Sequence, residues 1–285
     1  MRLARRLLVL AFATLAAAPL GVASRTASAD EIAPELETLE LRQKALAEAK
    51  KLLAGLSPSD QRRLTGTYVA FDGDASDPSA MVACDDDGDH VLVLTDAMLR
   101  LMSTVARAQS YDEATDGRSL DEYAELVARA QVPGRRLLPP APGFFGAAAS
   151  SPTHETHLRE AMSFVLAREL AHLRAGDLVC AHPTATHEAG DDVWTKAEQR
   201  RALETAGKIY PGDAARRDAE ATTRTLDASR SEEGALGLLR FFEKLESERA
   251  LHPTSAFVPT YVVQHPSSGA RAATVREAAR GRRTQ

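Results

Sequence analysis

Two side chains of catalytic types, Glu169 and His172, stand where a buried helix should be apolar. The helical stripe that leads to them, in steps of three and four residues, consists of Leu158, Met162 and Val165. A buried carboxylate and a buried imidazole are costly unless they are paired. We therefore expect a central helix that begins at about residue 158 and ends at Gly176, with one polar notch that faces a cleft.

The notch has the sequence R-E-L-A-H at residues 168–172, one residue away from the H-E-x-x-H sequence of zinc peptidases. In that sequence two imidazoles one helical turn apart share a zinc ion, and the intervening glutamate polarises the bound water. Arg168 takes the place of the first imidazole here. Because a guanidinium has no lone pair and stays protonated, it removes a ligand and adds a fixed cation. An ordinary helix with an edge salt bridge is the alternative interpretation.

The N-terminal segment has the pattern of an export signal. A basic start precedes an apolar run over residues 7–23, and A-S-A at residues 27–29 is a small-residue cleavage site. No later apolar stretch approaches the roughly 18 to 20 residues that cross a bilayer. We therefore expect an exported protein, periplasmic or secreted, whose mature chain begins at Asp30 and has no transmembrane segment.

Charge and cysteine content narrow the class of protein further. The full chain has a net charge of −5, and the predicted signal contains arginines but no acids, so the mature chain is more acidic still. An acidic surface argues against nucleic acid as a partner.

Export places Cys84 and Cys180 in an oxidising compartment, where a disulfide is expected, with two buried free thiols as the alternative. The hydrophobic content favours one domain with a sizeable core over two small ones.

Local patterns predict the elements that must position these residues. Residues 34–56 should form an amphipathic helix and residues 67–71 a short strand. Residues 80–84 and 90–94 flank an Asp- and Gly-containing turn and predict a β-hairpin. Further helices are expected at residues 96–108, 119–130, 193–206, 213–230 and 232–245, with a long loop over residues 132–151. Two histidines, His154 and His157, precede the central helix, and we expect them to be solvated, with metal binding as the alternative.

Three stretches fall in the order and approximate spacing of one family. The chain resembles the zinc endopeptidases related to the CAAX prenyl protease and HtpX (metallopeptidase family 48), including their soluble periplasmic members. Those proteins have H-E-x-x-H on a central helix, an E-x-x-x-D helix with the third ligand, and a His-Pro segment followed by Arg. The counterparts here are residues 168–172, 218–222 and 265–271. The likeness extends over about residues 80–280.

The resemblance implies an α+β, mostly helical fold: a zincin-like metallopeptidase domain with a central motif helix and a small antiparallel β-hairpin or sheet. Together with the predicted signal, it divides the chain into a signal peptide at residues 1–29, an N-terminal helix and short strand that pack on the body at residues 30–79, and the metallopeptidase-like domain at residues 80–285. In this fold the hairpin lies against the central helix, which favours pairing of Cys84 with Cys180.

The resemblance also assigns roles to site residues. Glu169 has the residue type of the family's general base. His172 has the residue type of its second zinc ligand. Asp218 stands where the third-ligand glutamate is expected, and Thr222 replaces an aspartate. His265 either approaches the remaining metal position or belongs to a His-Pro pair that begins the last helix. Since catalytic zinc normally has three protein ligands and one open position, we expect the family's zinc to bind weakly or not at all.

We interpret the chain as an exported protein with a zinc-metalloendopeptidase-like domain whose site is degenerate. It would be an inactive homologue that acts as a binding or regulatory module for a protein or peptide. One alternative is an active metalloendopeptidase that cleaves envelope or unfolded proteins with a non-standard ligand set. Another is an unrelated α-rich exported protein. The resemblance further implies that the third-ligand helix crosses the central helix, so that Arg168 and Asp218 form a salt bridge across the notch.

Overall fold

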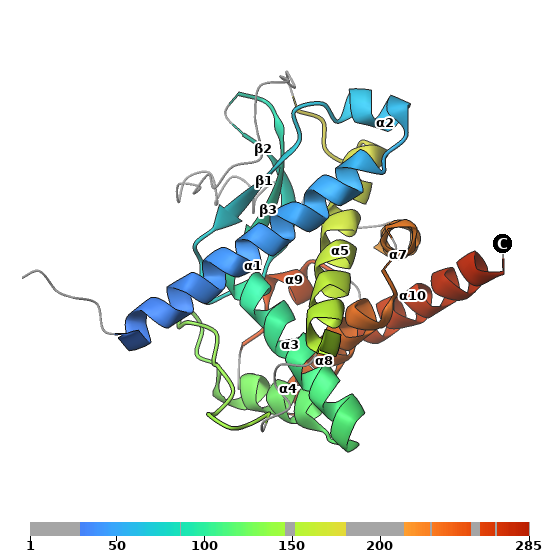
Figure 1. Cartoon of the computed structure of the whole chain (residues 1–285). Helices are drawn as coiled ribbons and strands as arrows, with labels where there is room; N and C mark the ends of the chain where they lie inside the picture. Colours follow the sequence, from blue (N-terminus) through green and yellow to red (C-terminus); the bar gives the residue numbers. More distant parts are fainter. Residues whose placement is uncertain are drawn as a thin grey trace, which may run out of the picture.

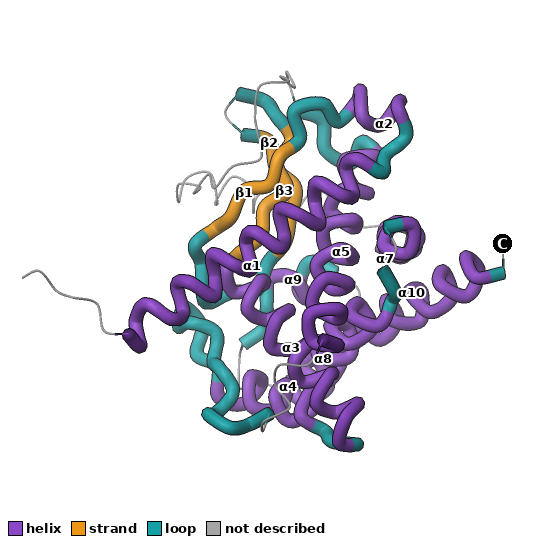
Figure 2. The backbone as a smooth tube through the Cα atoms, in the orientation of Figure 1, coloured by secondary structure: helices purple, strands orange, loops and turns teal. Residues whose placement is uncertain are grey.

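The computed structural model describes residues 29–85, 87–145, 152–180, 214–228, 230–251, 257–265 and 267–284. In these ranges the chain is mostly helical with one small sheet, so the α+β class is confirmed (Figure 2). The predicted helix at residues 193–206 and the predicted signal segment, except its last residue, lie outside the described residues. None of the described helices combines the length and the apolar character needed to span a bilayer.

Helix α5 (Pro152–Ala175) is the element on which most of the others pack. Almost every residue from His157 to Leu173 is buried, as in a helix that is covered on all sides. The helices that contact it are α1 (Ala29–Ala54), α3 (Asp96–Thr115), α7 (Ala214–Asp227) and α8 (Glu233–Leu251). Figure 1 shows α5 near the middle of the molecule, with α1 running diagonally in front of the sheet. The predicted stop is confirmed, because Gly176 follows the helix with a φ of 74°.

The start of α5 differs from the prediction. The helix begins at Pro152, because proline fits the first turn, where its missing N–H is not needed. His157 is therefore inside the helix and buried, so its expected solvation is wrong. Its Nδ1 lies 3.2 Å from an oxygen of Glu160, and its Nε2 lies 3.0 Å from an oxygen of Glu113 on α3. Burial alone lowers the pKa of His157, but the bonds to both carboxylates outweigh burial and raise it.

The sheet consists of β1 (Tyr68–Asp72), β2 (Ala80–Cys84) and β3 (His90–Thr95) in the order β1-β3-β2. The hairpin is confirmed, since β2 and β3 are antiparallel. However, β1 pairs with β3 in parallel, so the sheet is mixed and not antiparallel throughout as expected. All residues of β3 are buried, which fits its central position, because a strand that is apolar on both faces needs a neighbour on each side.

Alternate residues of the three strands serve two faces of the sheet. The face that joins the main core with the helices includes Val69, Phe71, Val82, Leu92 and Leu94. The other face forms a small separate cluster of Tyr68, Ala70, Met81, Ala83, Val91 and Val93. The sheet therefore supports α5 from one side and is itself buried on both.

The remaining helices complete the frame of the candidate site. They are α2 (Pro58–Arg63), α4 (Ser119–Ala130), α9 (Thr260–Val263) and α10 (Ser268–Arg283). Helix α10 begins with Ser267 as its N-cap, whose hydroxyl accepts a hydrogen bond from the backbone N–H of Ala270. The His-Pro pair thus precedes the helix start, and His265 lies in the turn after α9.

The predicted disulfide between Cys84 and Cys180 is present, with the two Cα atoms 5.5 Å apart. It joins the end of β2 to the segment that follows α5. The hairpin and the central helix are therefore covalently linked in addition to being packed together.

Replacing both Cys84 and Cys180 by serine should lower the free energy of unfolding by about 4 to 5 kcal/mol. The physical reason is that the open chain regains the conformational freedom of a loop whose ends are 96 residues apart in sequence. Urea unfolding of the oxidised protein and the double variant, followed by circular dichroism, measures the difference. A loss below about 1 kcal/mol would show that the loop entropy is offset elsewhere.

His157 should make stability depend on pH in a defined direction. Because its folded pKa is raised, its stabilisation is complete below the unfolded pKa of about 6.5 and is lost as the pH rises through the folded pKa. His157→Gln should therefore destabilise the protein more at about pH 5.5 than at about pH 8.5, as measured by urea unfolding.

His154 provides the matched control for this experiment, since burial, followed by the charge of Arg107, lowers its pKa. His154→Gln should show the opposite trend, with its relative stability improving as the pH falls. Parallel pH profiles for the two variants would contradict the role of the carboxylates beside His157.

Candidate functional site

Arg168 on α5 and Asp218 on α7 face each other in the interior, and neither side chain is exposed. The guanidinium Nε donates to Oδ1 of Asp218 at 3.1 Å. Asp218 points inward because it lies on the face of α7 that is buried at helical spacing together with Ala214, Ala221 and Thr225. The predicted salt bridge is thus confirmed.

The same guanidinium also neutralises the neighbouring acid of the motif. Nη1 of Arg168 donates to an oxygen of Glu169 at 3.1 Å. The expectation that the notch faces a cleft is wrong, because Arg168, Glu169 and His172 are only 0%, 1% and 3% exposed. The packing of α5 on several helices closes the notch and turns it into an interior ion network.

Asp218 is held by a second arginine that the sequence did not assign to the site. Arg271 on α10 donates to both carboxylate oxygens, with Nε 2.9 Å from Oδ2 and Nη2 3.0 Å from Oδ1. Its Nη2 also lies 3.1 Å from the hydroxyl of Tyr261 on α9. One feature of the sequence could have indicated that Arg271 belongs to the site. In the zinc endopeptidases that the chain resembles, an arginine likewise follows the His-Pro pair. Two-pronged bonding of this kind is typical of arginine with a carboxylate.

His172 is oriented by a different carboxylate, outside the motif helix. Its Nδ1 lies 2.8 Å from Oδ2 of Asp177, which follows the helix stop. Arg217 on α7 donates to both oxygens of Asp177 at 2.8 Å. Burial, followed by the charge of Arg168, lowers the pKa of His172 to about 4, so its imidazole is neutral at neutral pH. Neither Asp177 nor Arg217 was predicted as a site residue.

His265 lies beside Tyr261, which is itself bonded to Arg271. Its ring stacks on Tyr261 with the centroids 4.4 Å apart, and its Nδ1 contacts the backbone oxygen of the same residue. Burial lowers the pKa of His265 well below its usual value, and the charges of Arg168 and Arg271 lower it further. Asp218 contacts both Arg168 and Arg271, and Arg271 contacts Tyr261, on which His265 packs, so these residues lie in one region of the interior.

These donors do not fit a zinc ion as they are arranged. Both oxygens of Asp218 accept hydrogen bonds from guanidinium groups, and Nδ1 of His172 is directed at Asp177. Within the described ranges, no three His, Cys, Asp or Glu side chains are grouped so that they could hold a metal ion. Zinc at Asp218 would require both arginines to withdraw, since three cations cannot share one buried carboxylate at low cost. The arrangement therefore favours a structural role for the network.

Arg168→Ala should lower the free energy of unfolding by about 3 to 5 kcal/mol, because it leaves the buried Glu169 without its guanidinium. Asp218→Ala should cost at least as much, since Arg168 keeps Glu169 whereas the buried Arg271 loses both of its bonds to a carboxylate. Urea unfolding followed by circular dichroism measures both. The control is Arg282→Ala, which breaks an exposed pair with Asp227 and should cost less than about 1 kcal/mol. Equal losses for Arg168→Ala and the control would contradict the buried network.

Comparison with known proteins adds no further constraint on the site: no family model, no curated protein and no solved structure matches the chain.

Proposed function

We propose that the chain is an exported homologue of zinc endopeptidases in which an ion network replaces the metal centre, and that it acts as a binding or regulatory module. The observation that supports this most directly is the position of Arg168. Its guanidinium bridges Glu169 and Asp218, the residues that correspond to the general base and the third zinc ligand. The network thus uses the site residues of a peptidase for cohesion between helices.

The chemistry of the guanidinium supports the loss of catalysis. It carries a permanent positive charge and N–H donors, so it can balance the two carboxylates as a metal ion would. It has no lone pair for sharing a metal and cannot acidify a water molecule as zinc does. Glu169, the counterpart of the general base, is itself tied to Arg168 and buried. Hydrolysis by the family's mechanism therefore lacks both its activated water and a base that is free to act.

Two further observations support the remaining parts of the proposal. The disulfide between Cys84 and Cys180 fits an oxidising compartment outside the cytoplasm, in agreement with the signal-like N-terminal sequence. The acidic character of the chain disfavours nucleic acid, which leaves a protein or peptide as the partner class that the resemblance implies. The module would act by binding without cleavage.

Zinc content tests the proposal. The protein as purified should contain much less than one equivalent of zinc and should not cleave casein. Arg168→His should increase zinc affinity, because it introduces an imidazole one helical turn before His172 and removes a cation from Asp218. Arg168→Gln is the matched control, since it removes the same cation without adding an imidazole. Metal analysis and zinc titration by calorimetry measure these differences.

One equivalent of zinc in the unmodified protein, together with casein cleavage that stops on chelation, would overturn the proposal in favour of an active metalloendopeptidase. If the Arg168→His and Arg168→Gln variants bind zinc with equal affinity, the proposal that the ion network occupies the position of a metal site is contradicted. In that case the ion network would simply be the core of an unrelated α-rich exported protein.

A further inference from the structure

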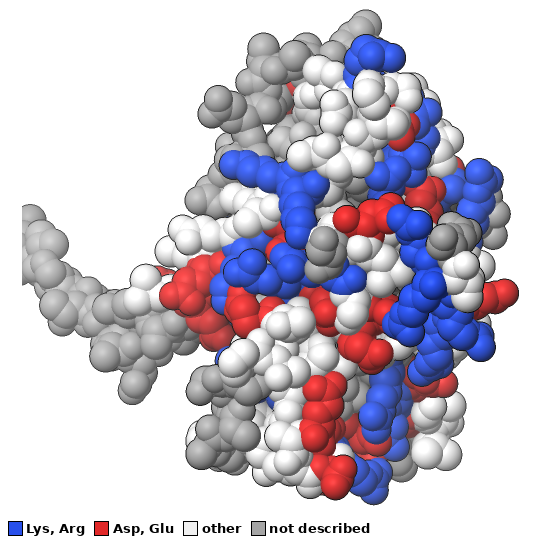
Figure 3. All heavy atoms as spheres, turned by 45° about the vertical axis from the view of Figure 1, so that its right-hand side comes forward, with Lys and Arg blue, Asp and Glu red and all other residues white. Residues whose placement is uncertain are grey.

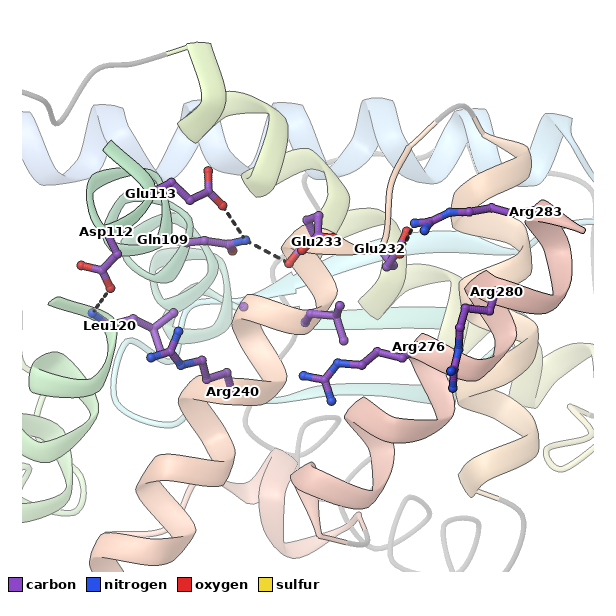
Figure 4. A pocket seen from close by; sticks show the side chains of 12 residues that line it. Gln109, Asp112, Glu113, Leu120, Glu232, Glu233, Arg240, Arg276, Arg280 and Arg283 are labelled. Carbon is purple, nitrogen blue, oxygen red and sulfur yellow. Dashed lines mark hydrogen bonds and ion pairs between the residues drawn. The ribbon is translucent and has the colours of Figure 1, made fainter. Parts of the chain in front are cut away.

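A surface cavity of about 630 Å³ lies between α3, α8, α10 and the start of α4. Its volume is in the range of sites that bind small molecules. Figure 4 shows Arg276 pointing from α10 toward α8, with Arg280 one turn further along α10. The residues of the buried ion network do not line this cavity, so its role can be tested independently of the proposed function.

The cavity is bordered by a stripe of arginines on α10. Arg276, Arg280 and Arg283 recur at steps of four and three residues, which places them on one side of the helix. Figure 3 shows basic side chains gathered on the side of the molecule where Figure 1 places α10. Arg283 is paired with Glu232, whereas Arg276 and Arg280 make no ion pair or hydrogen bond through their side chains in the described part of the chain. Two like charges one turn apart repel each other.

Three of the four acids around the cavity are already engaged with other groups and do not balance these two arginines. Glu113 lies 3.0 Å from His157. Asp112 accepts hydrogen bonds from two backbone amides at the start of α4, at 2.7 and 3.0 Å. Glu232 forms an ion pair with Arg283. Glu233 stands in the first turn of α8, where the helix dipole stabilises a carboxylate. The arginine side of the cavity therefore keeps an excess of positive charge.

The C-terminus of α10 offers a rival explanation for the arginines, because a helix dipole favours cations in the last turn. That explanation covers Arg280 and Arg283, which lie in this turn. It does not cover Arg276, which lies about two turns before the end of the helix, beyond the reach of the dipole effect. Arg276 also points over the cavity, so its charge is placed where a ligand would be (Figure 4).

We propose that this cavity binds a small organic anion through a carboxylate or phosphate group held by Arg276 and Arg280. Guanidinium groups present paired N–H donors that match the oxygens of both acidic groups. Leu120 and Leu236 also line the cavity and provide apolar contacts for the carbon part of the ligand. Binding of the anion would relieve the repulsion between the two arginines.

Calorimetric titration of the oxidised full chain with phenyl phosphate and with benzoate tests the proposal. The two probes share an aromatic body and differ in the acidic group, so the tighter one identifies the preferred head group. Replacing Arg276 and Arg280 together by alanine should weaken binding of that probe more than about tenfold. Both side chains are exposed, so the double variant should keep its fold, which circular dichroism verifies.

Arg282→Ala is the matched control, because Arg282 is an exposed arginine of the same helix that pairs with Asp227 outside the cavity. Its affinity for the probe should equal that of the unmodified protein. Absence of binding of both probes at millimolar concentration would overturn the proposal, as would equal affinity of the double variant and the control. If inorganic phosphate binds as tightly as phenyl phosphate, the assignment of an organic ligand fails.

Discussion

The buried carboxylate of Asp218 and its two guanidinium partners are the interaction on which the arrangement of the C-terminal half depends. Arg168, Asp218 and Arg271 come from α5, α7 and α10, so one carboxylate connects three helices that are distant in sequence. Burying a charge is costly unless it is paired and hydrogen-bonded. Glu169 supplies the second negative charge, so that two arginines and two acids balance each other in the interior. Such a network specifies how the helices pack because each charge would be stranded in another arrangement.

Under the proposed function, the same constraint would explain how a peptidase-like motif loses its chemistry and keeps its position. In the motif's usual form, a metal ion would neutralise the carboxylates between the crossing helices. Under the proposed function, Arg168 supplies that charge from α5 and Arg271 reinforces it from α10. A covalent side chain cannot dissociate as a metal can, so on this proposal the core would not depend on metal supply. The cost is the loss of an activated water, which a guanidinium cannot provide.

Sequence reasoning worked best where the signal is local. The hairpin follows from two short apolar runs around an Asp- and Gly-containing turn, and the helix at residues 119–130 from its periodicity. It failed where long-range packing decides. The parallel pairing of β1 with β3 and the burial of His157 depend on contacts with distant elements. The Arg168–Asp218 pair was predicted from a resemblance that implies a crossing of the two helices, whereas the donation from Arg271 to Asp218 has no local signature in the chain.

Helix α10 connects the interior network with the proposed anion site, because one side of the helix is buried in the core and the other side borders the cavity. Arg271, Val275 and Ala279 are buried, while Arg276 and Arg280 are exposed at the cavity. An anion that bridges Arg276 and Arg280 would stabilise the helical conformation of the segment that carries Arg271. By linkage, anything that binds the folded helix in preference to the unfolded chain also stabilises the network that the helix completes. The anion site and the ion network would then be thermodynamically coupled, although they share no residue.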